Sequence, residues 1–299
     1  MKIIVGTRGS NLAVTQTNHV IDMLKEKNPD VEFEVKTIKT KGDILKDVPL
    51  DKIGGKEVFI KEIEKELLEG DIDLAIHSMK DVPSVLPKGL KLSFIPKRED
   101  HRDVLVLRKG LNKLEDLKAG SKIGTGSKRR KYQMLELRED IEVVGIRGNV
   151  QTRIEKIETE NLDGVILAAA GINRLGLELE NTVIPLENDE LLSSPCQGIL
   201  ALEIRENDEK IEEILKTISD EKAEIQTKAE RAFLKGTGGS CHVPVGAYCE
   251  VYEEKIKLYG MLGTEDGETI KRHVIQGSID KAEELGEKLA NILSEEIGR

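Results

Sequence analysis

The fold predicted for this chain depends on the segment Asp71-Ile72-Asp73-Leu74-Ala75-Ile76-His77-Ser78-Met79-Lys80-Asp81-Val82-Pro83. Its apolar run, Ile72 to Ile76, is short and follows Gly70, which is typical of a buried strand. Polar residues follow at once, and Pro83 cannot donate a backbone hydrogen bond, so the chain should leave the sheet here as a loop. Ligands of open α/β sheets bind beyond the C-terminal ends of strands, which makes Lys80 and Asp81 candidate site residues. For this segment alone, the alternative is an ordinary solvated turn with a charge pair.

The composition predicts a soluble protein with more than one domain. A length of 299 residues suggests about two domains, with three possible. A net charge of −10 argues against general binding to nucleic acids or membrane surfaces, and no apolar run approaches the roughly 18 residues of a membrane span. We expect no signal peptide, and three cysteines are too few for a disulfide framework. A reduced, cytoplasmic protein is expected.

Two glycine-containing turns predict two similar domains. Lys2 to Val5 is strand-like and leads into Gly6-Thr7-Arg8-Gly9-Ser10, and Lys122-Ile123 leads into Gly124-Thr125-Gly126-Ser127. A helix is expected after each turn, and its dipole and free N–H groups favour anions there. Neither turn is a dinucleotide fingerprint or a Walker loop. The echo, about 118 positions apart from Gly6 to Gly124, indicates two α/β domains that each present a helix N-terminus to a ligand.

The chain is expected to cross between these domains twice. The first crossing is the charged run Lys97 to Asp103, and the second runs from Leu191 to Cys196 and through Gln197-Gly198. We therefore expect an α/β fold with a discontinuous first domain, followed by a small C-terminal α+β domain. The expected limits are 1–99 with 198–217 for domain 1, 100–197 for domain 2, and 218–299 for domain 3.

Basic residues concentrate in the second predicted site. Eight Lys/Arg and four acidic residues lie between Ser121 and Arg153, a local charge of +4 (8 − 4) in a chain of −10. Arginine contacts carboxylates with two parallel hydrogen bonds, so the cluster suits a ligand with several carboxylates. A basic solvated face is the alternative. The candidate ligand arginines, all just after predicted strand ends, are Arg8, Arg129, Arg130, Arg147, Arg153 and Arg174.

Cys241 lies between a glycine run and Val243-Pro244, where flexibility and exposure both favour reactivity. Cys196 and Cys249 are expected to be buried and structural. Metal binding by Cys241, His242 and Cys249 has unsuitable spacing, so no metal site is predicted. A two-domain anion-binding core alone does not explain a reactive cysteine on a third domain, whereas a covalently tethered substrate or cofactor does.

With these residues assembled, the chain resembles the porphobilinogen deaminase (hydroxymethylbilane synthase) family nearly from end to end. The shared motifs are, in chain order, Gly6-Thr7-Arg8-Gly9-Ser10, Gly54-Gly55-Lys56, His77 to Pro83, Arg98-Glu99-Asp100, Gly124 to Arg130, Arg147-Gly148-Asn149-Val150, Ala168-Ala169-Ala170-Gly171, Arg174-Leu175-Gly176 and Gly238-Gly239-Ser240-Cys241. The chain departs from the common pattern at Gly126-Ser127-Lys128, at Cys196, where glycine is common, and at His242. None of these departures affects Asp81, Cys241 or the arginines.

The resemblance implies two periplasmic-binding-protein-like α/β domains and a dipyrromethane cofactor joined to Cys241 by a thioether. Four porphobilinogen units would be added in turn, each losing ammonia, and hydrolysis would release hydroxymethylbilane, a step of tetrapyrrole biosynthesis. The implied partners are porphobilinogen and the growing polypyrrole chain, with no nucleic acid or membrane. A monomeric transferase is expected.

The resemblance also implies roles for individual residues. Asp81 would stabilise the cation formed as ammonia leaves and help move protons, and Lys80 would help keep it ionised. The arginines named above would bind acetate and propionate groups, and Gly54 to Phe59 would form a loop over the site. Further cofactor-binding candidates are Ser10, Thr125, Ser127 and Gln197. The competing hypothesis is a non-catalytic polyanion-binding or sensor module on the same fold, in which Cys241 is dispensable.

Overall fold

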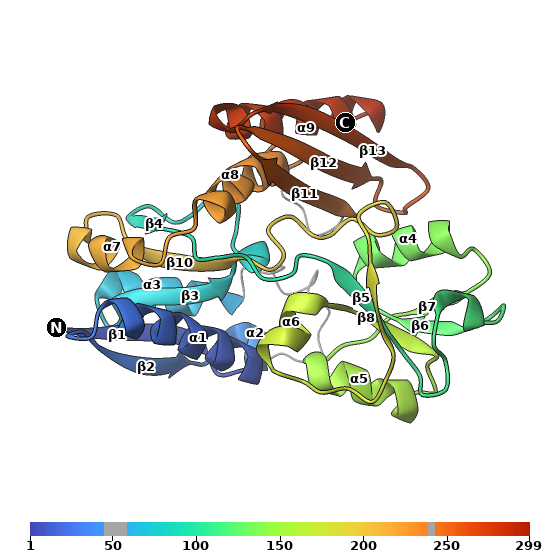
Figure 1. The fold of residues 1–299 in the computed structure, drawn as a ribbon, viewed down its shortest axis with the longest axis horizontal. Coiled ribbons are helices and arrows are strands. Elements are labelled where there is room, and N and C mark those ends of the chain that lie inside the picture. Colours follow the sequence, from blue (N-terminus) through green and yellow to red (C-terminus); the bar gives the residue numbers. More distant parts are fainter. Residues whose placement is uncertain (45–58, 239–242) are drawn as a thin grey trace.

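The computed structural model describes residues 1–44, 59–238 and 243–299. Two five-stranded sheets lie next to each other, and a three-stranded sheet with two helices lies across them (Figure 1). The expected Gly54-Gly55-Lys56 loop segment and Cys241 lie outside the described residues.

The first sheet has the strand order β2-β1-β3-β10-β4. Its strands are β1 (Lys2–Arg8), β2 (Glu32–Ile38), β3 (Leu74–Ser78), β4 (Leu90–Leu92) and β10 (Leu200–Arg205). Its helices are α1 (Asn11–Lys27), α2 (Lys41–Ile44), α3 (Lys61–Glu69) and α7 (Glu209–Lys216). β1 runs parallel to β2 and β3, whereas β10 is antiparallel to β3 and β4. The first domain is thus discontinuous, as predicted, because β10 arrives from the second crossing.

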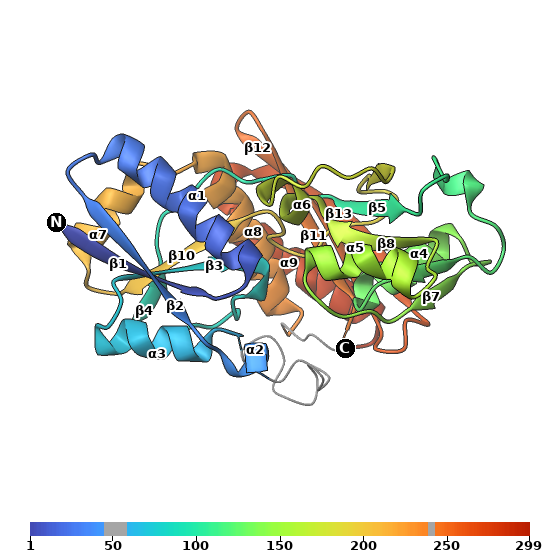
Figure 2. The same cartoon turned by 90° about the horizontal axis from the view of Figure 1, so that it is seen from below.

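The second sheet has the order β7-β6-β8-β5-β9. Its strands are β5 (Asp103–Leu107), β6 (Lys122–Gly124), β7 (Glu142–Val144), β8 (Gly164–Ala168) and β9 (Val183–Leu186). Its helices are α4 (Lys128–Leu137), α5 (Val150–Thr159) and α6 (Ala169–Arg174), with a 3-10 turn η4 (Leu114–Asp116). In the view from below, α1 lies over the first sheet, and α5 and α6 lie over the second (Figure 2).

The two sheets repeat one plan, which confirms the predicted similarity of the domains. In each, three parallel strands are followed by an antiparallel strand that comes directly from a crossing, β10 in the first sheet and β5 in the second. The matching glycines meet the same constraint. A Cβ on Gly6 would lie 2.3 Å from Cδ1 of Ile72, and one on Gly124 would lie 2.8 Å from Cδ1 of Leu162. Close packing therefore favours glycine at both strand ends.

The third domain packs two helices on one face of an antiparallel sheet. The elements are α8 (Glu221–Gly236), β11 (Val245–Tyr252), β12 (Lys255–Gly263), β13 (Ile270–Ser278), the 3-10 turn η5 (Ile279–Lys281) and α9 (Ala282–Glu296). Phe233, Leu258 and Leu289 are fully buried in its aliphatic core. α8 lies between this sheet and the first sheet (Figure 1), and its Glu230 contacts both crossings. No helix in the three described ranges is long and apolar enough to cross a membrane.

Some predicted limits were wrong. The apolar run from Leu90 to Ile95 predicts a single strand, but β4 ends at Leu92, and the carbonyl of Ile95 accepts from the N–H of Asp220 at the start of α8 (2.8 Å). The apolar run from Gly164 to Ala169 likewise predicts a strand, but Ala169 begins α6, consistent with the high helix propensity of alanine. β9 was not predicted from the sequence; Pro185 within it is tolerated because β9 is an edge strand.

Candidate functional site

Lys80 and Asp81 lie on η3 (Met79–Asp81), a 3-10 turn that directly follows β3. The N–H of Met79 donates to the carbonyl of Ile199 (3.0 Å), so the turn begins anchored to the second crossing. Nζ of Lys80 donates to Oε1 of Gln197 (3.1 Å). The predicted position at a strand's C-terminal end is therefore confirmed, and two neighbouring side chains of opposite charge are held on a short, ordered turn.

Arg231 of α8 spans the same turn from the third domain. Its Nη2 donates to the carbonyls of Pro83 (2.8 Å) and Ser84 (3.3 Å), and its Nη1 lies 3.7 Å from Sδ of Met79. These contacts lie on both sides of Asp81 in the chain. Sequence reasoning missed Arg231, because one arginine in a charged helix carries no distinguishing local signal.

Arginines of the second domain approach Asp81. The pKa of Arg153 falls to about 10, first because burial disfavours its charge and then because Arg130 and Arg147 repel it, while Asp81 acts in the opposite direction. Nε of Arg153 donates to the carbonyl of Gly148 (2.8 Å), which fixes the root of the guanidinium. Three predicted site residues from separate segments, Asp81, Arg130 and Arg147, are therefore close enough to Arg153 to affect its charge.

Arg129 and Arg130 are more deeply buried than a simple ligand-facing pair would be. The carboxylate of Asp103, which is fully buried, lies 2.7 Å from Nη2 of Arg129 and 2.6 Å from Nη2 of Arg130. Arg129 also donates to the carbonyl of Leu192 (2.6 Å), and Arg130 to that of Ile166 (3.1 Å). Burial alone would raise the pKa of Asp103, but the two arginines outweigh it and hold that pKa below its usual range.

Arg174 lies at the second crossing. Its Nη2 donates to the carbonyl of Gly198 (2.7 Å), and burial lowers its pKa to about 10 against the opposing charge of Glu99. Arg8 places its guanidinium carbon 4.1 Å from the ring centroid of Phe59, a cation–π contact. Arg174 thus lies near the second crossing, and Arg8 lies near the start of α3.

The three predicted hydroxyl residues form the ends of α1 and α4. Oγ of Ser10 accepts from the N–H of Ala13 (3.3 Å), and Oγ of Ser127 accepts from the N–H of Arg130 (3.4 Å). Oγ1 of Thr125 accepts from the N–H of Ser127 (3.2 Å). A hydroxyl that accepts at a helix cap keeps its own hydrogen to donate, so these contacts are compatible with ligand binding at both helix N-termini.

The crossings converge on a carboxylate that sequence reasoning missed. Glu230 of α8 is fully buried and accepts from Nη1 (2.6 Å) and Nη2 (3.1 Å) of Arg98. It also accepts from the backbone N–H groups of Cys196 (2.5 Å) and Cys249 (2.8 Å). One side chain thereby joins both crossings to β11. Cys196 and Cys249 are buried free thiols whose pKa burial raises, so they are structural, as expected.

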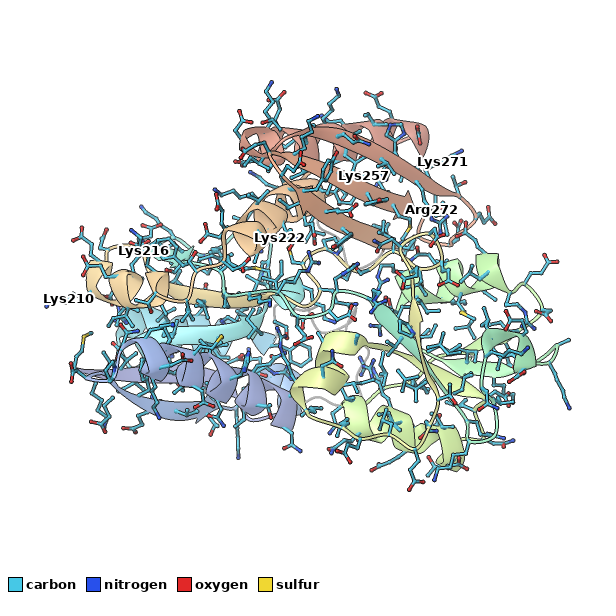
Figure 3. All side chains as sticks on the ribbon, viewed as in Figure 1. Lys210, Lys216, Lys222, Lys257, Lys271 and Arg272 are labelled. Carbon is cyan, nitrogen blue, oxygen red and sulfur yellow. The ribbon has the colours of Figure 1, made fainter. Side chains whose placement is uncertain are left out.

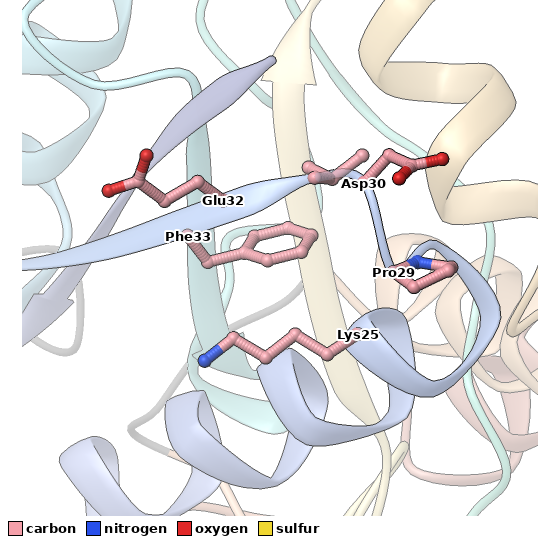
Figure 4. A pocket seen from close by; sticks show the side chains of 6 residues that line it. Lys25, Pro29, Asp30, Glu32 and Phe33 are labelled. Atoms are coloured by element: carbon pink, nitrogen blue, oxygen red, sulfur yellow. The ribbon is translucent and has the colours of Figure 1, made fainter.

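Other polar features lie away from this region. A hollow of about 520 Å³ is lined by Lys25, Pro29, Asp30, Val31, Glu32 and Phe33 (Figure 4). It lies where β2 begins, the edge of the sheet opposite to that used by ligands of α/β folds. Figure 3 labels cations on α7, α8, β12 and β13, which are spread over several elements and do not converge as those near Asp81 do.

These features define a protein with two α/β domains and a smaller third domain, in which the chain crossings bring cations of the second domain toward a carboxylate of the first. Residues 3–213 match the family model "Porphobilinogen deaminase, dipyromethane cofactor binding domain", and residues 224–295 match "Porphobilinogen deaminase, C-terminal domain". The chain belongs to the porphobilinogen deaminase family. The activity and dipyrromethane cofactor implied by the resemblance are confirmed by this match, and the non-catalytic alternative is not favoured.

Relatives named porphobilinogen deaminase match nearly the whole length of this chain. The chain is 56% identical to the porphobilinogen deaminase of Clostridium novyi (strain NT), with 99% of this chain and 100% of the relative covered. It is 53% identical to that of Clostridioides difficile (strain 630), with 99% and 98% covered. Among solved structures, it is 13% identical to the probable amino-acid ABC transporter extracellular-binding protein ytmK of Bacillus subtilis, with a TM-score of 0.45 and 79% and 97% of the two chains covered.

Proposed function

We propose that this protein acts as a hydroxymethylbilane synthase, a transferase that joins four porphobilinogen molecules on a primer held by Cys241 and then releases the product by hydrolysis. The observation that carries the assignment of the site is that Asp81 of the first domain, together with Arg130 and Arg147 of the second, lies close enough to the buried Arg153 to affect its charge. A carboxylate of the first domain thus faces cations of the second, which suits a substrate that bears carboxylates and becomes cationic as it reacts.

The residues present fit a dipyrromethane group. Its acetate and propionate carboxylates require several cations, and buried or partly buried arginines from separate segments converge beside Asp81. When bound, the group supplies the pyrrole carbon to which the first substrate unit is joined. The residues proposed to hold its carboxylates and those of the substrate are Arg8, Arg129, Arg130, Arg147, Arg153 and Arg174, with Ser10, Thr125, Ser127 and Gln197 adding hydrogen bonds.

Asp81 is proposed to act at the reacting centre. Loss of ammonia leaves positive charge on the substrate's methylene-pyrrole unit, and an ionised carboxylate at fixed distance lowers the energy of that state. Asp81 would also hold pyrrole N–H groups and accept a proton as aromaticity returns. Lys80, held by Gln197, would favour the ionised form of Asp81.

We further propose that the protein is a cytoplasmic monomer and that its domains have the limits predicted above. The two crossings, together with the Glu230 contacts, support a boundary near residue 99 and another near residue 198.

The test is the intact mass of the protein purified from a host that makes porphobilinogen. We expect an excess of two pyrrole units over the polypeptide, absent in Cys241→Ser. Cys249→Ser is the matched control, because that thiol is fully buried and should leave the excess unchanged. A bare polypeptide mass that does not change on incubation with porphobilinogen would overturn the tethered-primer mechanism.

A further inference from the structure

Asp103, the first residue of β5, joins three side chains on one buried carboxylate. Its Oδ1 accepts from Nε (3.0 Å) and Nη2 (2.6 Å) of Arg130 and from Nε2 of Gln197 (3.0 Å). Its Oδ2 lies 2.7 Å from Nη2 of Arg129. The side chain of Asp103 is inaccessible to solvent, and those of Arg129 and Arg130 are only 7% and 8% exposed.

The carboxylate keeps the two guanidinium groups together. Like charges so close in a poorly solvated place repel each other, and Arg130 indeed lowers the pKa of Arg129. One negative charge between two positive ones leaves the trio with a net charge of +1. The trio is therefore a fixed cationic unit whose orientation depends on Asp103, not on solvent or on a ligand.

Gln197 extends this unit to the turn that bears Asp81. Its Nε2 donates to Asp103 and also to the carbonyl of His101 (2.8 Å), while its Oε1 accepts from Nζ of Lys80 (3.1 Å). A side-chain amide has one donor end and one acceptor end. Fixing the donor end on Asp103 consequently turns the acceptor end toward Lys80.

We propose that Asp103 is a positioning residue of the deaminase reaction, holding Arg129 and Arg130 as a fixed pair for substrate carboxylates and placing Lys80 through Gln197. The inference rests on the proposed function. It assigns two separable roles to one carboxylate. Its contacts with Arg129 and Arg130, the arginine branch, serve substrate binding. Its contact through Gln197 with Lys80, the Lys80 branch, serves the chemical step beside Asp81.

Steady-state kinetics of three variants separate the branches. Asp103→Asn, nearly the same shape without the charge, should raise KM and lower kcat, with kcat/KM falling roughly 100-fold because both branches lose their alignment. Gln197→Leu removes the contact with Lys80 and one hydrogen bond to Asp103 but leaves both arginine contacts of Asp103 in place, so it should lower kcat by a larger factor than it raises KM. In the double variant, kcat should fall no further than in Asp103→Asn alone, because both substitutions break one chain of contacts.

Two controls make the outcomes decisive. Asp73→Asn removes another carboxylate that pairs with an arginine, Arg205, in the first domain (3.1 Å), and it should leave kcat and KM unchanged. Asp103→Glu keeps the negative charge and should therefore retain part of the kcat that is lost in Asp103→Asn. If Asp103→Asn fails to fold, the KM-against-kcat split of Gln197→Leu decides the Lys80 branch.

Wild-type kinetics in Asp103→Asn would overturn the inference, and so would multiplicative kcat losses in the double variant or an unaltered kcat in Gln197→Leu. If the wild-type protein itself released no ammonia from porphobilinogen, the proposed function would fail first and this inference with it.

Discussion

Arg98 and Glu230 form a two-pronged ion pair, with nitrogen–oxygen distances of 2.6 and 3.1 Å, between the first crossing and the third domain. The side chains are 7% and 0% exposed, so almost no solvent screens them. Burial would lower the pKa of Arg98, but the charge of Glu230 outweighs this and raises that pKa. The third domain is thus fixed to one of the two segments that connect the other two domains.

Glu230→Gln should destabilise the protein strongly. The guanidinium of Arg98 would stay buried without a counter-charge, which costs about 3–5 kcal/mol when one partner of a buried pair is removed. Urea unfolding gives the measurement. Glu136→Gln, in a partly exposed pair with Arg272, is the control and should cost about 1 kcal/mol or less. If Glu230→Gln and Glu136→Gln lowered the free energy of unfolding equally, the buried Glu230 carboxylate would contribute no more to stability than a surface ion pair does.

Asp81→Asn should nearly abolish ammonia release from porphobilinogen and leave the fold intact. The amide has the shape of the carboxylate but not its charge, so stabilisation of the developing cation is lost, and we expect a fall in kcat of about 100-fold or more. Ammonia release and the urea midpoint should be measured on the same preparation. Near-normal release by a folded variant would remove Asp81 from its proposed role.

Gly198→Ala should disrupt the contact between the two crossings. A Cβ at this position would lie 2.4 Å from the carbonyl oxygen of Glu99, and φ is +87°, so clash and backbone strain add to at least about 2 kcal/mol. Gly110 offers a matched control, because it has φ of +95° but open space around its Cβ position. Gly110→Ala should cost only about 1 kcal/mol from strain. The difference between the two unfolding free energies measures the close approach of the crossings.

Protonation of His101 should weaken the fold below neutral pH. Its ring stacks on Tyr248 of β11 at a centroid distance of 3.6 Å, and burial, followed by the charge of Arg98, lowers its pKa from 6.5 to about 4. Between pH 6.5 and 4 the unfolded chain therefore binds the proton more readily, so the free energy of unfolding falls as pH falls.

His101→Phe keeps a stacking ring and removes the titration. Urea unfolding at pH 7, 6 and 5 should show that wild type loses stability relative to this variant as pH decreases. His19→Phe, on an exposed position of α1, controls for loss of an imidazole elsewhere. If the free energy of unfolding changed with pH in parallel for wild type and His101→Phe, protonation of His101 would not be what weakens the fold.

Much of the candidate site could be predicted from the sequence because its residues lie in patterns formed by neighbouring residues. The run before His77 predicted β3 and its polar end, and the two glycine turns predicted a repeated plan that the sheets share. Cys196 was noted from the sequence as a departure from the family's common pattern, and the structure places it at a φ of +60°, in the left-handed region that favours glycine.

The partners of the buried charges are not readable in this way. Arg129 and Arg130 were predicted as ligand residues, but nothing in their spacing indicates that Asp103, on another strand, lies between them. Glu230 and Arg231 are adjacent in a charged helix, yet one binds the crossings and the other the turn of Asp81.

By itself, the sequence determined β3 with its polar end, the glycine turns, the excess of arginine and the family, because these depend on neighbouring residues or on motifs in a fixed order. Only the tertiary structure decided which charges lose their water and which partner each one meets. The energy of a charge depends on its distance to other charges and on its burial, and both are set by strands and helices that are far apart in the chain.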